Sequence, residues 1–147
     1  MKTTTGNYFL DYVDRPPMTF NINRIDHIVM TVGNVEKTTR FYTDILGMTK
    51  VSLGDNRTAL AFGKQKINLH PLSNDITPKA STPSPGSLDI CLITDTPITT
   101  VVDELQQQNI DVEQGPVQRQ GAQGNMTSVY IRDPDGNLIE IANYNDS

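Results

Sequence analysis

The stretch IDHIVMTVGNVEKTTRFYTDILGM, residues 25–48, predicts a buried strand followed by an amphipathic helix. Its first part, 25–32, is short, apolar and rich in β-branched residues, as is typical of a strand. Asn34 is a favourable N-cap, and apolar residues then recur at helical spacing. Gly47 stands where a helix commonly ends in a left-handed residue. We therefore expect a strand at 25–32 and a helix that begins after Asn34 and ends before Gly47.

Three strand-like runs follow this helix, at 48–53, 57–62 and 66–70, and the order of elements is therefore βαβββ. Residues 71–86 contain four of the nine prolines and almost no large apolar side chain, which indicates a surface linker.

The same order recurs after the linker. A strand is expected at 87–93, then a helix with Thr96 as its N-cap and Pro97 at its first position. Three more strands are expected at 110–117, 126–132 and 137–143. Residues 1–21 have no apolar period and are interpreted as an N-terminal extension. The predicted fold is α+β, with one domain at 22–147 made of two βαβββ modules, 22–70 and 87–147.

Four polar residues interrupt strands that are otherwise apolar. His27 lies eight residues before Val35, and Asp89 lies eight before Pro97, so these two are related by an offset of 62. Counting back from the strand ends relates His70 to Glu140 with an offset of 70. Two imidazoles and two carboxylates suit a divalent ion such as Zn²⁺, Ni²⁺, Mn²⁺ or Fe²⁺, provided that the four side chains converge. The alternative for each histidine is a structural residue hydrogen-bonded to the backbone.

Composition excludes several classes of function. The net charge of -5 and a pI near 4.8 leave no broad positive surface, so we expect neither a nucleic-acid partner nor an acidic membrane. The apolar runs are far shorter than the roughly twenty residues that span a bilayer. With a single cysteine, Cys91, and no apolar leader at the N-terminus, the chain is expected to be cytoplasmic.

Residues 25–48 and the segment RDPDGNLIEI, 132–141, resemble the vicinal oxygen chelate superfamily, which includes glyoxalase I, extradiol dioxygenases and bleomycin-resistance proteins. GSLDICLIT (86–94) and GPVQRQGAQG (115–124) further resemble a glyoxalase-like subgroup that includes a bacterial virulence-associated protein. The resemblance implies paired modules that form an incomplete, cup-shaped barrel around one metal ion, in a homodimer. Whether the modules pair within one chain or between two chains stays open.

The resemblance also implies a ligand set of His27, His70, Asp89 and Glu140. His70 stands where glyoxalase I usually has a glutamate, and Asp89 stands where the family more often has a histidine. Asp89 is therefore a direct ligand, a ligand through water, a residue that orients a ligand, or a polar residue without metal contact.

The implied activity is that of a metal-dependent lyase of the glyoxalase I (lactoylglutathione lyase) type. The cation chelates two neighbouring substrate oxygens, and Glu140 removes a proton next to the carbonyl. A glutathione hemithioacetal is the implied substrate. The alternatives are a metal-free protein that binds and sequesters a small molecule, and an Fe(II) dioxygenase with the same ligands.

Several other residues have two interpretations each. Cys91 shares a strand face with Asp89 and is expected to be a small buried side chain. Arg57, Arg119 and Arg132 either contact an anionic substrate or remain solvated. Tyr130 lines the cup or belongs to the core. The loop 119–125 with Gly121 and Gly124 is a lid or an ordinary surface loop, and DPDG at 133–136 is a turn without a catalytic role.

Overall fold

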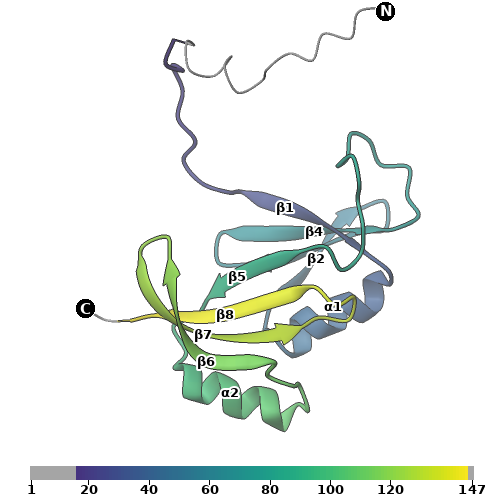
Figure 1. Cartoon of the computed structure of the whole chain (residues 1–147). Helices are drawn as coiled ribbons and strands as arrows, with labels where there is room; N and C mark the ends of the chain where they lie inside the picture. The colour runs from purple at the N-terminus through teal and green to yellow at the C-terminus, as the bar shows by residue number, and fades with distance from the viewer. Residues whose placement is uncertain (1–15, 146–147) are drawn as a thin grey trace, which may run out of the picture.

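The computed structural model describes residues 16–145, and these form two βαβββ modules (Figure 1). The first module contains β1 (His27–Val32), α1 (Val35–Asp44), β2 (Thr49–Gly54), β3 (Arg57–Phe62) and β4 (Gln65–Pro71). The second contains β5 (Asp89–Ile93), α2 (Ile98–Gln107), β6 (Gln114–Gly121), β7 (Gly124–Arg132) and β8 (Leu138–Tyr144). The predicted α+β class is confirmed. Residues 1–15, which belong to the predicted N-terminal extension, lie outside the described residues.

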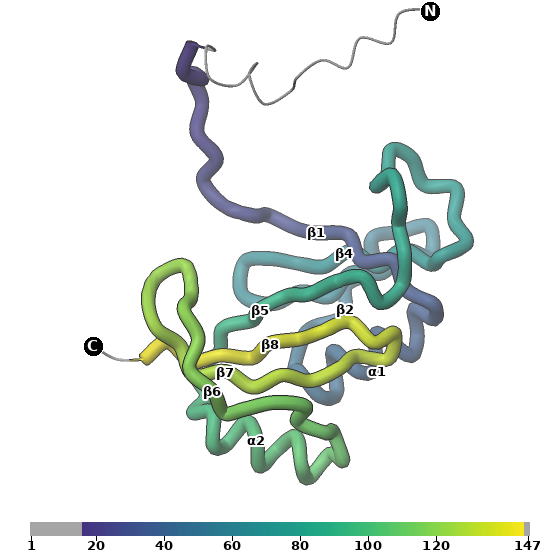
Figure 2. Tube along the Cα trace, viewed as in Figure 1, coloured from purple at the N-terminus to yellow at the C-terminus, as the bar shows by residue number. Residues whose placement is uncertain are grey.

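Each module builds one mixed four-stranded sheet. The strand order is β1-β4-β3-β2 in the first sheet and β5-β8-β7-β6 in the second. The pairs β1–β4 and β5–β8 are parallel, and the remaining pairs are antiparallel. Within 16–145 the two sheets do not close into a barrel, as expected for an incomplete cup. The segment between β4 and β5 makes a long excursion away from the sheets (Figure 2).

The two helices begin in different ways. The predicted N-cap of α1 is confirmed, because the Asn34 side chain accepts a hydrogen bond from the Lys37 backbone N–H at 2.8 Å. The prediction for α2 is wrong by one residue: its N-cap is Pro97, which has no capping side chain, instead of Thr96. A side chain from β8 replaces the missing cap, since Asn143 Oδ1 accepts from the Ile98 N–H at 2.8 Å.

The predicted loop at 119–125 is largely a β-hairpin. β6 starts later than the predicted strand at 110–117 and continues to Gly121, and β7 starts already at Gly124. Gly121 pairs with Gly124 across the turn, and Arg119 pairs with Met126. The hairpin was not predicted because most of its residues are polar, so its strands lack the alternation of apolar and polar residues by which strands are recognised. A lid at this position would therefore have to be a hydrogen-bonded hairpin instead of a free loop.

One hydrophobic core joins both modules. It is formed by the helix-facing residues of both sheets together with buried residues of both helices: Met30, Val32, Tyr42, Leu60, Ile67, Leu69, Leu105, Val129, Ile131, Ile139 and Ile141. Alternation along the strands places the intervening side chains on the opposite face of each sheet. The predicted site residues lie on these opposite faces.

A buried polar network connects the modules at the turn before β8. Asp133 is 6% exposed. Its Oδ2 accepts hydrogen bonds from the Tyr42 hydroxyl and from Asn137 Nδ2, both at 2.8 Å. Its Oδ1 accepts from the backbone N–H groups of Asp135 and Asn137, both at 2.9 Å. Burial, then the charge of Asp133, raises the pKa of Tyr42, so the hydroxyl stays protonated and keeps donating. The DPDG turn thus holds α1 against the second sheet.

Among residues 16–145, no helix combines the length and the apolar character needed to cross a membrane.

Candidate functional site

On the face opposite the core, the second sheet carries a group of polar side chains around Glu140, which we call the polar floor. Glu140 lies in β8, between Cys91 of β5 and Tyr130 of β7 in the strand register. The fully buried Ser128 donates its hydroxyl to Glu140 Oε2 at 2.6 Å. This bond leaves Oε1 without a partner among the hydrogen bonds of the described residues. Glu140 is therefore oriented through one oxygen and available through the other.

The thiol beside Glu140 is less acidic than an ordinary cysteine. Burial and then the negative charges of Glu140 and Asp89 raise the pKa of Cys91 to about 11. Cys91 is nevertheless exposed, so its predicted place as a buried residue is wrong. The reason is that β5 is an edge strand of its sheet, whose face opposite the core is uncovered at this point.

Arg119 and Tyr130 extend the polar floor toward β6. Arg119 Nε donates to the Tyr130 hydroxyl at 2.9 Å, and its guanidinium carbon lies 5.4 Å from the centre of the Tyr130 ring. Among the described residues Arg119 has no carboxylate within ion-pair distance. By contrast, Arg132 is engaged by Glu113 at 3.1 Å and by the Gly136 carbonyl. Arg119 is thus the better candidate of the two for an anionic ligand.

His27 lies on the corresponding face of the first sheet, opposite the core. It is exposed at the start of β1, where its Nδ1 lies 2.9 Å from Asp26 Oδ2. A carboxylate on Nδ1 fixes the ring and leaves Nε2 as the free nitrogen, which is the usual arrangement of a histidine that binds metal. His27 and Asp89 occupy the same place in their modules, because each is the first residue of the strand that pairs in parallel with the last.

His70 lies at the other end of the parallel pair. It is opposite Thr31, whereas His27 is opposite Lys66. Four residues of strand therefore separate the two histidines, or about 13 Å at roughly 3.3 Å per residue. His70 lines a cavity of about 200 Å³ beneath the segment between β4 and β5. Burial there, followed by the charges of Arg57 and Lys79, lowers the pKa of His70.

The predicted equivalence of His70 and Glu140 is wrong. Glu140 pairs with Cys91, two residues after Asp89, and the residue two positions after His27 pairs with Asn68. Asn68 therefore occupies the place of Glu140 in the first module. Its Oδ1 is buried and has no hydrogen-bond partner within residues 16–145. The sequence did contain a signal for this, because Asn68 is flanked by Ile67 and Leu69 as Glu140 is by Ile139 and Ile141.

Within one chain the four predicted residues are divided between the two sheets, and His27 and His70 of the first sheet lie at opposite ends of the β1–β4 pair. No group of three His, Cys, Asp or Glu side chains among residues 16–145 is close enough to hold a metal ion. Asp89 and Glu140 share the floor of the second sheet, and His27 lies on the first. The donor types suit a divalent ion, but residues 16–145 of a single chain do not bring three of them together.

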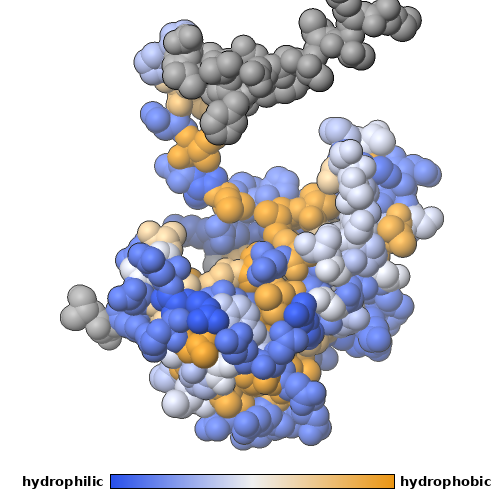
Figure 3. All heavy atoms as spheres, viewed as in Figure 1, coloured by the Kyte–Doolittle hydropathy of each residue, from blue (hydrophilic) through white to orange (hydrophobic). Residues whose placement is uncertain are grey.

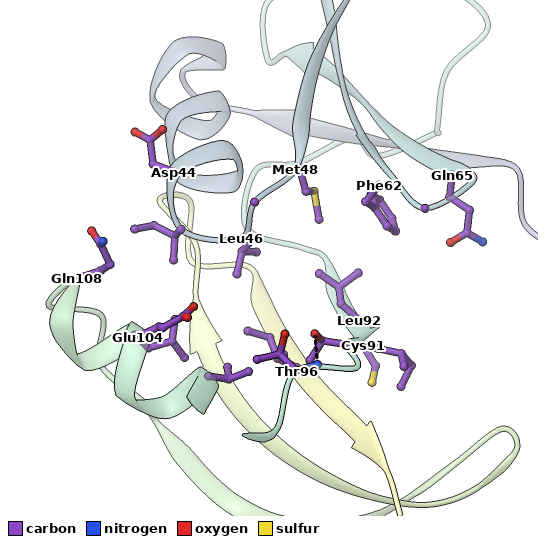
Figure 4. A pocket seen from close by; sticks show the side chains of 18 of the residues that line it. Asp44, Leu46, Met48, Phe62, Gln65, Cys91, Leu92, Thr96, Glu104 and Gln108 are labelled. Atoms are coloured by element: carbon purple, nitrogen blue, oxygen red, sulfur yellow. Dashed lines mark hydrogen bonds between the residues drawn. The ribbon is translucent and has the colours of Figure 1, made fainter. Parts of the chain in front are cut away.

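A cavity of about 880 Å³, which we call the inter-module cleft, was not expected from the sequence. It lies between the end of α1, the β3–β4 turn, the end of β5 and α2 (Figure 4). Apolar side chains from both modules line it, including Leu46, Met48, Phe62, Leu92 and Val101. Asp44 and Glu104 also line it, no lysine or arginine does, and the Glu104 carboxylate points inward (Figure 4).

Comparison with known proteins gives a family match over most of the chain. Residues 24–141 match the model of the Glyoxalase/Bleomycin resistance protein/Dioxygenase superfamily. The chain is 52% identical over 135 residues to Virulence protein STM3117 of Salmonella typhimurium, covering 92% of this chain and 94% of that protein. It is 46% identical over 127 residues to the Glyoxalase domain-containing protein RDO1 of Mycosarcoma maydis, covering 86% and 72% respectively.

Solved structures share the fold. The crystal structure of the Salmonella typhimurium protein superposes with a TM-score of 0.84 at 54% identity, over 86% of this chain and 100% of that one. The structure of Lactoylglutathione lyase from Agrobacterium tumefaciens has a TM-score of 0.65 at 22% identity, over 84% and 95%. At this identity the second likeness concerns the fold alone.

Proposed function

The chain belongs to the glyoxalase/bleomycin resistance protein/dioxygenase superfamily, and we propose that it is a metal-dependent lyase of the glyoxalase type. We further propose that each site is assembled from two copies of the chain, as a homodimer. The observation that carries the proposal is the oriented Glu140 carboxylate, which has one oxygen bound by Ser128 and the other available.

The proposed ligands come from two sheets. His27 of one copy would meet Asp89 and Glu140 of another copy, and together these donors suit Ni²⁺, Zn²⁺, Mn²⁺ or Fe²⁺. The finding that no group of three donors forms among the described residues of a single chain supports a site made from two copies. His70 stays a predicted ligand. It is the least supported of the four, because it lies four strand residues away from His27.

A bound divalent ion would stabilise the negative charge that develops on a substrate oxygen next to the carbonyl. The chain's own residues supply the remaining functions. Glu140 accepts the proton at Oε1, while the Ser128 hydroxyl holds Oε2 in place. Arg119, oriented by the Tyr130 hydroxyl, offers positive charge for a carboxylate of the substrate, such as those of a glutathione hemithioacetal.

A second candidate function is metal-free binding of a small molecule. The observation in its favour is that the described residues of one chain bring no three metal-binding side chains together. The inter-module cleft also offers apolar surface for a ligand. A ring-opening Fe(II) dioxygenase is a third candidate, which the preferred metal separates from a lyase.

Metal content measured by elemental analysis tests the proposal. The purified chain is reconstituted with each of the four ions, desalted, and compared with Glu140→Gln and His27→Gln. We expect about one ion per chain in the wild type and much less in both variants, because each removes a donor. Glu113→Gln is the matched control, since Glu113 is an exposed glutamate of the same module that pairs with Arg132. No retained ion under any condition would favour the binding protein.

Mixing the two variants tests whether the site is shared. A heterodimer of His27→Gln and Glu140→Gln chains contains one site with both native residues if the donors come from different copies. Random subunit exchange in an equal mixture makes about half of the dimers heterodimers, so the mixture should regain about a quarter of the wild-type metal content and lyase activity. If both residues act within one chain, every site in the mixture lacks a donor and nothing is regained.

A further inference from the structure

The described part of the N-terminal extension is an apolar arm without a partner. Residues 16–25, which we call the arm, leave the body of the molecule before β1 (Figure 1). Met18, Phe20 and Ile22 are 71%, 60% and 80% exposed. They alternate with Thr19, Asn21 and Asn23, so an extended arm carries its apolar side chains on one side. Apolar residues on the arm are visible against its polar neighbours in Figure 3.

Exposed side chains of this size cost free energy in water and point to a surface that covers them. The inter-module cleft offers such a surface. It is lined by Leu46, Met48, Phe62 and other apolar side chains together with polar ones, and residues 16–145 leave its volume of about 880 Å³ unfilled. The arm and the cleft thus both present apolar side chains that no other part of residues 16–145 covers.

Charge also matches the arm to the cleft. Arg24 is the only charged residue of the arm, and its guanidinium contacts only the neighbouring Asn23 among the described residues. No lysine or arginine lines the cleft among the described residues, whereas Asp44 lines it and the Glu104 carboxylate points into it. A positive arm entering an acidic cleft would be attracted and would place Arg24 near a carboxylate.

The root of the arm lies at the edge of the cleft of its own chain. Gln65 lines the cleft and donates a hydrogen bond from its side chain to the Ile25 carbonyl at 3.0 Å. The arm then runs outward from this edge (Figure 1). A two-fold arrangement that brings two such edges together lets each arm reach the cleft of the other copy, as in an isologous dimer.

We propose that the arm of one copy docks in the inter-module cleft of a second copy, and that this reciprocal exchange holds a homodimer together. The partner is a second copy of the same chain. His27 follows the arm by two residues, so an exchanged arm also carries His27 toward the other copy. The arm proposal nevertheless depends only on the arm and the cleft and does not require a metal.

Sedimentation equilibrium of the full chain, with a chelator present, tests the exchange. The wild type should be a dimer, and Phe20→Ser/Ile22→Ser should raise the dimer dissociation constant at least about a hundredfold, because two apolar anchors are lost. Leu72→Ser is the control, since Leu72 is 58% exposed but lies outside the arm and the cleft. A monomeric wild type, or a double variant that dimerises as tightly as the wild type, would overturn the proposal.

Oxidative cross-linking tests where the arm docks. Cys91 lines the cleft and is the only cysteine of the chain, so Ile22→Cys introduces the single possible partner. Oxidation with copper phenanthroline at about pH 9, where more thiolate forms, should give a disulfide between residues 22 and 91 of different chains. Asn21→Cys, on the opposite side of the arm, should give much less, and adding Cys91→Ser should abolish this link.

Peptide mapping reads out the cross-link. A disulfide between residues 22 and 91 in a covalent monomer would show that the arm folds onto its own cleft and would refute the exchange. A dimer without this disulfide would refute the docking place. These results are separable from the metal site, because association is measured with a chelator present and the cross-link is identified by which residues it joins. Failure of the shared metal site would appear only in the metal content of the mixed variants.

Discussion

Asp133 is expected to be one of the most sensitive positions of the fold, although it lies in a turn. Its buried carboxylate accepts four hydrogen bonds and links Tyr42 of α1 to the turn before β8. Asp133→Ala leaves these donors without an acceptor in a site that is 6% exposed in the wild type. Breaking such a network costs about 3–5 kcal/mol in free energy of unfolding. Tyr42→Phe removes one bond to the same carboxylate and should cost about 1.5–3 kcal/mol.

Urea unfolding followed by circular dichroism measures both costs. The protein concentration is held constant with a chelator present, because self-association and metal binding both change apparent stability. Asp103→Ala is the matched control, since Asp103 is an exposed aspartate of α2, and it should change stability by no more than about 0.5 kcal/mol. If Asp133→Ala costs no more than this control, the interpretation of the network as the link between the modules is wrong.

Three further expectations concern titratable groups. Because the pKa of Tyr42 is raised in the folded protein, the unfolded chain ionises first above the ordinary tyrosine value of 10.0, and the fold then loses stability as the pH rises. Urea titrations should therefore show a steeper fall of the free energy of unfolding above pH 10.0 in the wild type than in Tyr42→Phe. In metal-free protein at about pH 8, roughly one Cys91 thiol in a thousand is ionised, so alkylation of this exposed thiol should be slow. Glu140→Gln should accelerate the alkylation because it removes a negative charge beside the thiol. An unchanged rate would contradict the role of the Glu140 charge. NMR should find that His70 titrates below 6.5, and Lys79→Ala should move its pKa upward, whereas a midpoint above 6.5 would show that the cavity does not desolvate the ring.

Local pattern was sufficient for the elements of the fold. The helix of the first module begins after Asn34 because one side chain caps it, and the signal lies within four residues of sequence. Gly47 adopts the left-handed conformation expected after the first helix, with φ of 68°, and Asn109 does the same after α2, with φ of 58°. Such signals are readable because the residues that interact are close together in the chain.

The failures have a common cause in contacts between distant residues. The cap of α2 comes from Asn143, 45 residues further along, so no local signal pointed to it. The register of β4 against β1 decided that Asn68, and not His70, occupies the position in the first module that Glu140 has in the second. Counting from strand ends failed because the equivalence is set by how β4 pairs with β1 and β8 pairs with β5.

The sequence alone determined the two βαβββ modules, their apolar faces and the residue types available for chemistry, because periodicity and capping are properties of neighbouring residues. Tertiary structure decided the rest: that His27 and Glu140 of one chain lie on different sheets, that Ser128 orients Glu140, and that a cleft remains between the modules. These features arise from strand register and from the packing of one module on the other, which bring together side chains that lie far apart in the chain.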